Sequence, residues 1–391
     1  MGAIGKVLVF FAITTAVSAA VLYTWMQSMK VPDGFIEPGK LRMAFAMIKT
    51  FGAVNGIMTF FTGKGLPMDS LVITDLPPSL TKEEKYIEGI RTVIYRPVGE
   101  SKIRPAIVYY HGGGWIMGRP EIDEAYHSDL IDDFGVVVIS IDYRLAPKHP
   151  FPIPFDDCYK VTKYVLDNTK EFNIDPKRIV ISGASAGGNL AAAVGTKLRD
   201  EGLAKKIRGQ LLIVPVLQAH DFETTSYKEN RYDSLVSQEG MIAAWVQYAL
   251  GENDNDAVQS LVANTHVPQE KRDDFVKLCG NSPHLTKTVN KPTDKKLWKR
   301  LQPYFENPYM APLVAKDLSG IAPTIVVTAG QDVLRDDGLI YAERLKRSGV
   351  QVSSVHIASA FHGSFAMKNF VPLDYDRAYK EVMPHLKKLL E

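Results

Sequence analysis

A serine flanked by small residues is the first feature of this 391-residue sequence that suggests chemistry. The stretch "RIVISGASAGGNLAAAV", from Arg178 to Val194, has the pattern of a buried strand, a tight turn and a helix. In that context Gly-x-Ser-x-Gly predicts a nucleophile elbow, with the oxygen of Ser185 exposed where the helix begins. The five-residue pattern alone also arises by chance, so other residues must support this interpretation.

A serine hydroxyl becomes a nucleophile when a base removes its proton and a carboxylate orients that base. Downstream, "VVTAGQDVLRDDG" presents Asp332 directly after a strand, and "ASAFHGSF" presents His362 after the next one. The order Ser, Asp, His and the strand-end positions predict a triad at one edge of a parallel sheet. Asp336 and Asp337 are alternative acids, but they fall in the helix that follows and are expected to point elsewhere.

A glycine triplet supplies the third part of the expected chemistry. "YYHGGGWIMG" contains His111, Gly112, Gly113 and Gly114 after a strand. Backbone amides of such a loop, together with the amide of Ala186, would donate to the negatively charged oxygen of an acyl-transfer intermediate. No Gly-Lys-Ser/Thr follows, which excludes a phosphate-binding loop. This chemistry requires neither a metal nor a cofactor, and we expect none.

The elements that must position these residues form an α/β pattern. Short β-branched segments, several of them continuously apolar, alternate with helical stretches, which predicts a mostly parallel sheet with helices on both faces. The predicted strands are 89–97, 105–112, 135–144, 178–183, 209–216, 323–330 and 352–359.

Two regions interrupt this alternation. The connection at about 220–305 is long enough to form a cap, and its basic residues, including Lys291 and Arg300, fit a solvated helix face better than a lipid headgroup site. Residues 41–61 are apolar but carry Arg42 and Lys49, which makes them a poor membrane span. They predict either a helix packed on the main domain or a lid that touches the bilayer surface.

The N-terminus carries twenty residues without a charge, from Val7 to Met26. That length matches a hydrocarbon core of about 30 Å, so we predict an uncleaved signal anchor. A cleaved signal sequence and a buried helix are the alternatives, and the former would use the small residues of "AVSAA". The flanking charges do not fix the orientation.

Composition excludes some functions and leaves others open. With a net charge of +2 and no clustered basic face, a nucleic-acid partner is not expected. Cys158 and Cys279 have no metal-ligand spacing, and either one bridge or two free thiols fits the sequence.

The chain resembles the hormone-sensitive-lipase branch of the α/β-hydrolases, and more closely its membrane-anchored arylacetamide deacetylase and neutral cholesterol ester hydrolase group. The matching stretches are "YYHGGGW", "DYRLAPKHPFP", "RIVISGASAGGNLAAAV", "NPYMAPL", "DVLRDDG" and "FHGSF", in the order that this group has. The resemblance implies an α/β-hydrolase fold, a Ser185–His362–Asp332 triad, and oxyanion donors at Gly113, Gly114 and Ala186 with Gly112 shaping the loop. It also implies lipophilic ester or amide substrates and a lumenal domain on a single-pass type II anchor in the endoplasmic reticulum membrane.

Two departures from the resembled group concern the edge of the site. Ala184 stands where many relatives have Asp, and Ile116 and Ala329 or Gly330 occupy positions that hold cysteines in deacetylases of this group. A site-flanking disulfide is therefore not expected here.

Together these patterns divide the chain into a tail (1–6), a signal-anchor helix (7–26), N-terminal cap helices (27–88) and a catalytic domain (89–391) with its cap insertion. The predicted function is a membrane-anchored serine hydrolase of lipophilic esters that contacts the bilayer through residues 7–26. A non-catalytic ligand receptor on the same fold and a serine peptidase are the alternatives.

Overall fold

The central sheet has the strand order β1-β2-β4-β3-β5-β6-β7-β8 in the computed structural model, which describes residues 77–99, 102–231, 235–285 and 291–391, together with 19–20, 22–27, 29, 31, 34–47 and 49–50. β2 pairs antiparallel with β1 on one side and with β4 on the other, and all other neighbouring strands are parallel. The predicted, mostly parallel sheet is therefore confirmed. The strands are β1 Leu80–Ile87, β2 Ile90–Pro97, β3 Arg104–Tyr110, β4 Val137–Ile141, β5 Ile174–Ala184, β6 Gly209–Ile213, β7 Thr324–Gln331 and β8 Val352–Phe361.

The strand that the sequence did not predict is β1. Half of its sequence LTKEEKYI is charged, and only Leu80 and Ile87 at its two ends are buried. An edge strand with solvent on most of its sides shows no apolar alternation, so the pattern that identifies the inner strands is absent. The sheet therefore begins at Leu80, inside the segment 27–88 that was predicted to form cap helices.

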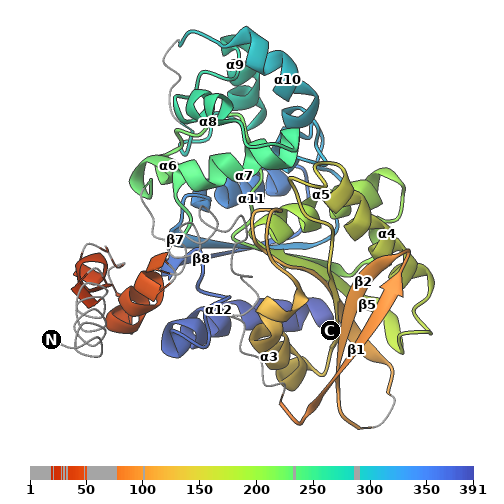
Figure 1. Cartoon of the computed structure of the whole chain (residues 1–391). Coiled ribbons are helices and arrows are strands. Elements are labelled where there is room, and N and C mark those ends of the chain that lie inside the picture. The colour runs from red at the N-terminus through yellow and green to blue at the C-terminus, as the bar shows by residue number, and fades with distance from the viewer. Residues whose placement is uncertain are drawn as a thin grey trace, which may run out of the picture.

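Helices cover both faces of the sheet (Figure 1). On one face lie α3 Glu124–Phe134, after the short η2 Pro120–Asp123, and α12 Pro372–Leu390. On the other lie α4 Ile153–Asp167, α5 Ala186–Asp200 and α11 Arg335–Arg347. Single 3-10 turns occur at η3 Ala204–Lys206 and η4 Pro312–Val314. Cys158 in α4 and Cys279 in the cap are both buried and free, so the bridge that the sequence left open is not formed.

A helical cap lies between β6 and β7, above the sheet in Figure 1. It contains α6 Thr225–Glu229, α7 Gln238–Leu250, α8 Asn255–Val262, α9 Gln269–Leu278 and α10 Lys295–Phe305, within the insertion predicted at about 220–305. Part of its basic stretch is used inside the cap, because Arg300 pairs with Glu252 and Asp254 and Lys291 pairs with Glu223.

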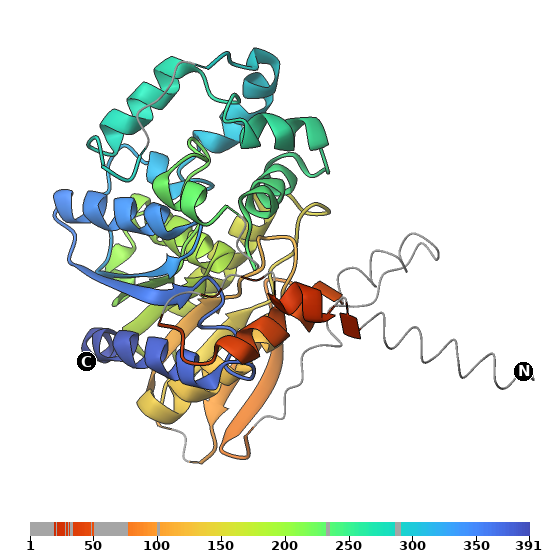
Figure 2. The same cartoon turned by 90° about the vertical axis from the view of Figure 1, so that its left-hand side faces the viewer.

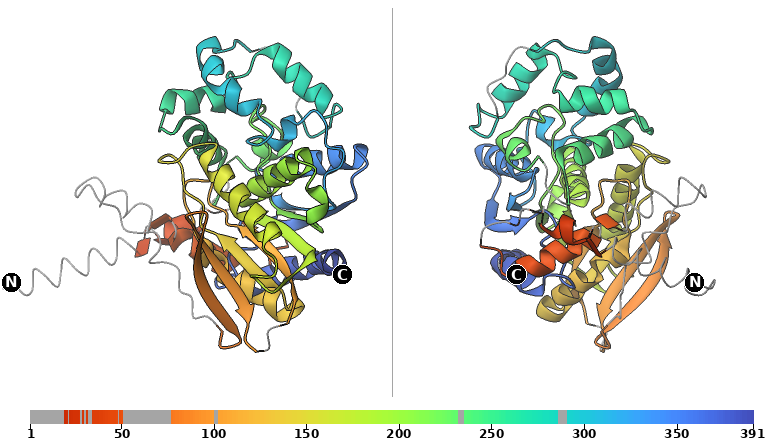
Figure 3. Two further views of the ribbon diagram at one scale, coloured as in Figure 1. Left: turned by 90° about the vertical axis from the view of Figure 1, so that its right-hand side faces the viewer. Right: turned by 60° about the vertical axis from the view of Figure 1, so that its left-hand side comes forward.

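The N-terminal part of the chain packs on the catalytic domain through a helix at residues 38–47. Figures 2 and 3 show this segment in red beside the beginning of α12. It corresponds to the first part of the apolar segment 41–61, and residues 51–61 lie outside the described residues. Of the predicted anchor 7–26, residues 19–20 and 22–26 are described and helical. Among the residues described, no helix has both the length and the apolar character needed to span a membrane.

Candidate active site

Ser185 occupies the turn between β5 and α5, so the strand–turn–helix context predicted for a nucleophile elbow is confirmed. Its backbone has φ 59° and ψ −119°, a conformation that residues other than glycine rarely adopt. A hydrogen bond to the neighbouring strand β6 holds the turn, because the amide of Ser185 donates to the carbonyl oxygen of Ile213 at 2.9 Å. The strained turn separates the strand from the helix with Ser185 at its apex.

Gly187 allows the elbow to contact the neighbouring strand directly. A Cβ atom at this position would lie 1.9 Å from the carbonyl oxygen of Tyr110, the last residue of β3. The glycine loop that follows β3 is thereby brought to Ser185, and a Cβ on Gly112 would lie 3.6 Å from the Cβ of Ser185. The small residues of the elbow are thus explained by backbone contact between β3 and the turn.

The glycine loop turns back on itself immediately after His111. Gly113 has φ 112°, and a Cβ there would lie 2.1 Å from the carbonyl oxygen of Met117, so only glycine fits without a shift. In the described part of the chain the amides of Gly113, Gly114 and Ala186 have no protein acceptor. These are the groups that the sequence predicted as oxyanion donors.

His111 supports this loop from inside. Its Nδ1 lies 2.8 Å from the carbonyl oxygen of Gly112, which can only accept, so Nδ1 carries the proton. Burial lowers the pKa of His111 to about 4, which keeps the ring neutral near pH 7. The ring stacks on Tyr143 with centroids 4.1 Å apart, and the hydroxyl of Tyr143 donates to the carbonyl oxygen of His111 at 2.8 Å. His111 thus acts on the shape of the loop.

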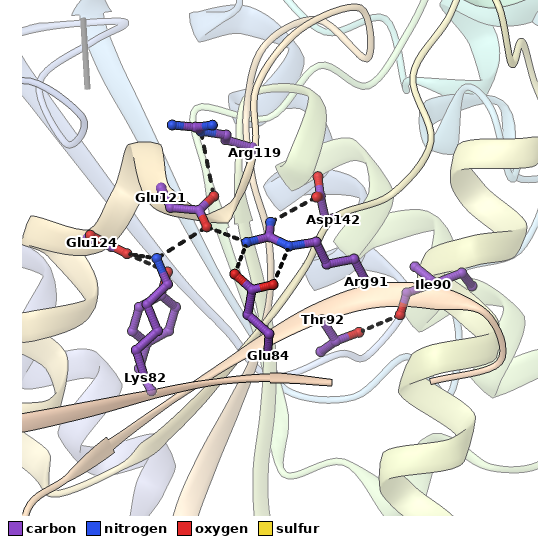
Figure 4. A network of polar contacts seen from close by, with 10 residues as sticks. Lys82, Glu84, Ile90, Arg91, Thr92, Arg119, Glu121, Glu124 and Asp142 are labelled. Atoms are coloured by element: carbon purple, nitrogen blue, oxygen red, sulfur yellow. Dashed lines mark hydrogen bonds and ion pairs between the residues drawn. The ribbon is translucent and has the colours of Figure 1, made fainter. Parts of the chain in front are cut away.

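A network of charged side chains fixes the chain just beyond the glycine loop (Figure 4). Arg91 of β2 donates to Glu84 of β1, to Glu121 of η2 and to Asp142, while Lys82 pairs with Glu121. Burial alone would raise the pKa of Glu121, but its hydrogen bonds, that from Arg91 foremost, hold the pKa at about 2. The network ties the end of the loop to the antiparallel edge of the sheet.

Asp332 and His362 form a buried pair at the ends of β7 and β8. His362 Nδ1 lies 2.9 Å from Asp332 Oδ2, and the other carboxylate oxygen accepts from the amide of Leu334 at 2.9 Å. Asp332 is fully buried and His362 is 9% exposed. Because a carboxylate oxygen accepts this hydrogen bond, Nδ1 carries the proton, and Nε2 is the basic nitrogen of the neutral ring.

The first segment of the cap holds the loop that carries Asp332. Asn230 donates through its side chain to the carbonyl oxygen of Asp332 at 3.1 Å. The hydroxyl of Ser226 donates to the carbonyl oxygen of Val333 at 2.7 Å. Sequence reasoning did not identify these positioning residues, because Ser and Asn in a cap carry no signal of their contacts.

The two alternative acids have structural partners of their own. Asp336 accepts from the backbone amide of Ser226 at 2.6 Å, and Asp337 accepts from that of Leu217 and from the side chain of Gln218, both at 3.0 Å. Burial raises the pKa of Asp337 to about 7. Asp336 joins the cap to α11, and Asp337 joins the chain that follows β6 to α11, so both carboxyl groups have structural partners, as expected from their helical position.

The N-terminal segment packs on the residue that precedes His362. The rings of Phe35 and Phe45 meet Phe361 edge-on, with centroids 5.6 and 5.5 Å away. All three side chains are buried in one cluster together with Met367 and Val371. His362 therefore follows a residue that is packed by side chains more than 300 positions away in the sequence.

Two carboxylates join the same segment to α12. Asp374 accepts from the backbone amides of Ile36 and Glu37, at 2.8 and 2.9 Å, and Glu37 accepts in return from the amide of Leu373 at 2.8 Å. Asp374 of α12 thus binds amides just before the helix at 38–47, and Glu37 binds an amide in the first turn of α12. These are the positions where a helix leaves backbone N–H groups without partners inside the helix. We call this arrangement the carboxylate clasp. The sequence contained no motif that would have predicted it.

Asn189, which follows the elbow, connects α5 to the chain leaving the cap. Its amide nitrogen donates to the carbonyl oxygens of Val216 and Met310, at 2.7 and 2.8 Å. Met310 belongs to the "NPYMAPL" stretch, so this hydrogen bond joins that stretch to the helix of the elbow. Within the described residues, no group of His, Cys, Asp or Glu side chains is arranged to hold a metal ion.

Comparison with known proteins agrees with this geometry. Residues 107–272 and 265–366 match a family described by its alpha/beta hydrolase fold. Arylacetamide deacetylase of Bos taurus is 36% identical over 86% of this chain and 89% of its own length. Neutral cholesterol ester hydrolase 1 of Bos taurus is 31% identical over 90% of this chain and 91% of its own. A solved esterase from Rhizomucor miehei superposes with a TM-score of 0.64 at 26% identity, covering 87% of this chain and 90% of that one.

Proposed function

Because the chain belongs to the α/β-hydrolase family and is a carboxylesterase-type hydrolase, we propose that it cleaves lipophilic esters with a Ser185–His362–Asp332 triad. The observation that carries the proposal is the buried His362–Asp332 hydrogen bond at the sheet edge where Ser185 occupies its strained turn. These elements come from three strands that end on the same side of one parallel sheet.

In the proposed first step, Nε2 of His362 takes the proton of Ser185 while the serine oxygen attacks the ester carbonyl. Asp332 keeps Nδ1 protonated and stabilises the imidazolium that forms. The amides of Gly113, Gly114 and Ala186 then donate to the oxyanion, each contributing about 3 kcal/mol in comparable enzymes. The alcohol leaves with the proton of the imidazolium, which gives an acyl-enzyme.

In the second step, water attacks the acyl-enzyme with His362 again as the base. The same amides stabilise the second oxyanion, and Ser185 leaves with the proton. Gly112 would shape the loop while its neighbours donate. Nothing in this sequence of steps calls for a group beyond the chain's own residues and water.

The relatives' names support the proposed substrate class, and the N-terminal sequence supports the proposed anchor. Relatives named for aryl acetamides and for cholesterol esters support aryl amides and cholesteryl esters as substrates, and we include acylglycerols in the same proposed class of lipophilic esters. The uncharged segment 7–26 supports a single-pass anchor. We place the catalytic domain in the lumen of the endoplasmic reticulum as part of the same proposal.

Fluorophosphonate labelling of the full chain tests the nucleophile. We expect the wild-type chain to be labelled, Ser185→Ala to be unlabelled, and the neighbouring Ser182→Ala, buried in β5, to retain labelling. Equal labelling of wild type and Ser185→Ala would refute the proposed nucleophile. An unlabelled but folded wild type would favour the ligand receptor instead.

A panel of p-nitrophenyl esters of rising chain length tests the substrate class. A sharp loss of turnover beyond short acyl chains would count against a lipid hydrolase. Protease protection in sealed microsomes tests the topology. Digestion of the catalytic domain in intact vesicles would overturn the lumenal assignment.

A further inference from the structure

We propose that the catalytic domain rests on a lipid surface through the outer side of the N-terminal helix and the adjoining start of α12. The surface consists of Ile36, Met43, Met47, Phe370 and Leu373, and we call it the apolar face. The proposal rests on the membrane anchoring proposed above and adds the part of the catalytic domain that meets the bilayer.

The first observation is where the exposed apolar side chains lie. The five residues of the apolar face are between 42% and 51% exposed. They belong to two segments in direct contact, since the carboxylate clasp joins residues 36 and 37 to residues 373 and 374. Soluble proteins usually scatter such residues singly, and a concentration of them marks an interaction surface.

The second observation is that the helix at 38–47 exposes methionines on its outer side, beside Lys40, in addition to its apolar inner side. Its inner side buries Leu41, Ala44 and Phe45 against the cluster around Phe361. On its outer side Met43 and Met47, one turn apart, are 50% and 44% exposed. A helix on a soluble surface normally carries polar residues there, so this outer side is built for an apolar partner.

The apolar face is a fixed part of the catalytic domain. Asp374 is 2% exposed and Glu37 9% exposed, and both bind backbone amides of the other segment. The edge-on contacts of Phe35 and Phe45 with Phe361 add a buried attachment. A partner that binds the outer side therefore contacts an ordered surface that also supports the loop of His362.

Charge and position along the chain favour lipid over a protein partner. Between residues 38 and 50 the sequence has three basic residues and no acidic one. Lys49 is exposed, and Lys40 is exposed as well although it pairs with Glu37. Basic side chains beside apolar ones suit an anionic headgroup layer. Ile36 follows the end of the predicted anchor, Met26, by ten residues, so it lies within about 35 Å of the point where the chain leaves the bilayer.

The test uses the full chain reconstituted in vesicles of phosphatidylcholine and phosphatidylserine. Cys158 and Cys279 are buried, so a cysteine introduced on the surface is the site that a polarity-sensitive nitrobenzoxadiazole maleimide labels. Met43→Cys and Leu373→Cys report on the apolar face. Ile103→Cys, at a position 70% exposed next to β3, is the matched control.

With nitroxide-labelled phosphatidylcholine in the vesicles, we expect fluorescence quenching at positions 43 and 373 to exceed that at 103 by about twofold or more. Quenching at Met43→Cys no greater than at Ile103→Cys would overturn the proposal. A blue-shifted emission at 43 without lipid quenching would indicate cover by protein and would overturn it as well.

Flotation and activity of the same samples separate this proposal from the proposed function. If the protein floats with the vesicles and hydrolyses p-nitrophenyl acetate, but the label at position 43 is not quenched, only the lipid contact of the apolar face is refuted. Protein that hydrolyses the ester but does not float would refute the anchor and the face together. Quenched but inactive protein would refute the esterase proposal and support the face.

Discussion

The turn of Ser185 and the loop of His362 are positioned by different means. At Ser185 the backbone does the positioning, because strand, turn and helix follow one another and glycine permits direct contact with β3. At His362 side chains from distant segments do it, among them Phe35 and Phe45. The position of Ser185 therefore depends on local chain geometry, whereas that of His362 depends on packing by residues that are far away in the sequence.

This difference explains how the two regions respond to substitution. A backbone contact between glycine and a carbonyl oxygen cannot relax without moving a strand, so a single methyl group is damaging there. A loop packed by aromatic rings can tolerate a smaller side chain and still fold, but it will hold its histidine less well. The following changes are ordered from the largest expected effect to the smallest.

Gly187→Ala should produce the largest loss. The new Cβ would lie 1.9 Å from the carbonyl oxygen of Tyr110, so β3 or the elbow must move. We expect unfolding to become easier by about 3 kcal/mol or more and fluorophosphonate labelling to fall to background. Urea denaturation followed by tryptophan fluorescence measures the first effect and gel-based labelling the second.

Gly39→Ala is the matched control for that experiment. Gly39 lies in the N-terminal helix, and a Cβ there would meet nothing within 4 Å. Its effect should stay within about 1 kcal/mol and favour the helix. Wild-type stability and labelling in Gly187→Ala would contradict the role that we give to backbone contact at the elbow.

Phe45→Ala should reduce turnover while the global fold survives. It removes one of the two rings that meet Phe361 edge-on, next to His362. We expect kcat for p-nitrophenyl acetate to fall about tenfold with little change in KM, since a cavity costs a few kcal/mol locally and loosens the loop. The pH profile of kcat/KM should also shift, which a purely structural defect would not cause.

Two variants sharpen this prediction. Phe45→Leu refills most of the cavity and should restore most of the turnover. Met47→Ala changes an exposed side chain of the same helix and should leave the hydrolysis of a soluble ester unchanged. If Phe45→Ala raises KM alone, the N-terminal segment acts on substrate binding and does not position the base.

Asp123→Asn should have the smallest effect, confined to the pH dependence of stability. Burial raises the pKa of Asp123 to about 7, above the value of about 3.9 expected in the unfolded chain. Between these two values the folded state binds more protons, so the free energy of unfolding decreases as pH rises from about 4 to about 7. Replacing the carboxyl group removes this part of the decrease.

Urea unfolding of both proteins at pH 5 and pH 8 measures the difference. The loss of stability between the two pH values should be about 1–3 kcal/mol smaller in the variant. Asp337, whose pKa is also about 7, should preserve part of the decrease in both proteins. An identical pH dependence would contradict a protonated Asp123 in the folded state.

The inner strands and the site residues they carry were predictable from the sequence to different extents. β5 to β7 have apolar runs, the edge strand β8 has an alternating burial pattern, and Ser185, Asp332 and His362 follow β5, β7 and β8 at their ends. The edge strand β1 was not predicted, because its charged residues face solvent and give no apolar period. The apolar segment 41–61 was predicted to be helical. Without knowing what it packs against, a helix packed on the main domain could not be distinguished from a lid that touches the bilayer surface.

Contacts across hundreds of residues were beyond any pattern in the sequence. Nothing about Ser226 or Asn230 indicates that they hold the loop of Asp332, and nothing about Phe45 indicates that it packs on Phe361. In the sequence, Asp336 and Asp337 differed from Asp332 only in their predicted position within a helix. The structure shows that their carboxylates accept hydrogen bonds from the backbone amides of Ser226 and Leu217.

The sequence by itself determined the order of the elements, the turn that carries Ser185 and the glycine loop beside it. These features depend on neighbouring residues, whose small size and apolar period decide the local backbone. The tertiary structure alone decided how the His362–Asp332 pair is held, where the clasp forms and which side of the N-terminal helix stays exposed. Those outcomes depend on burial and on hydrogen bonds between segments that only the folded sheet brings together.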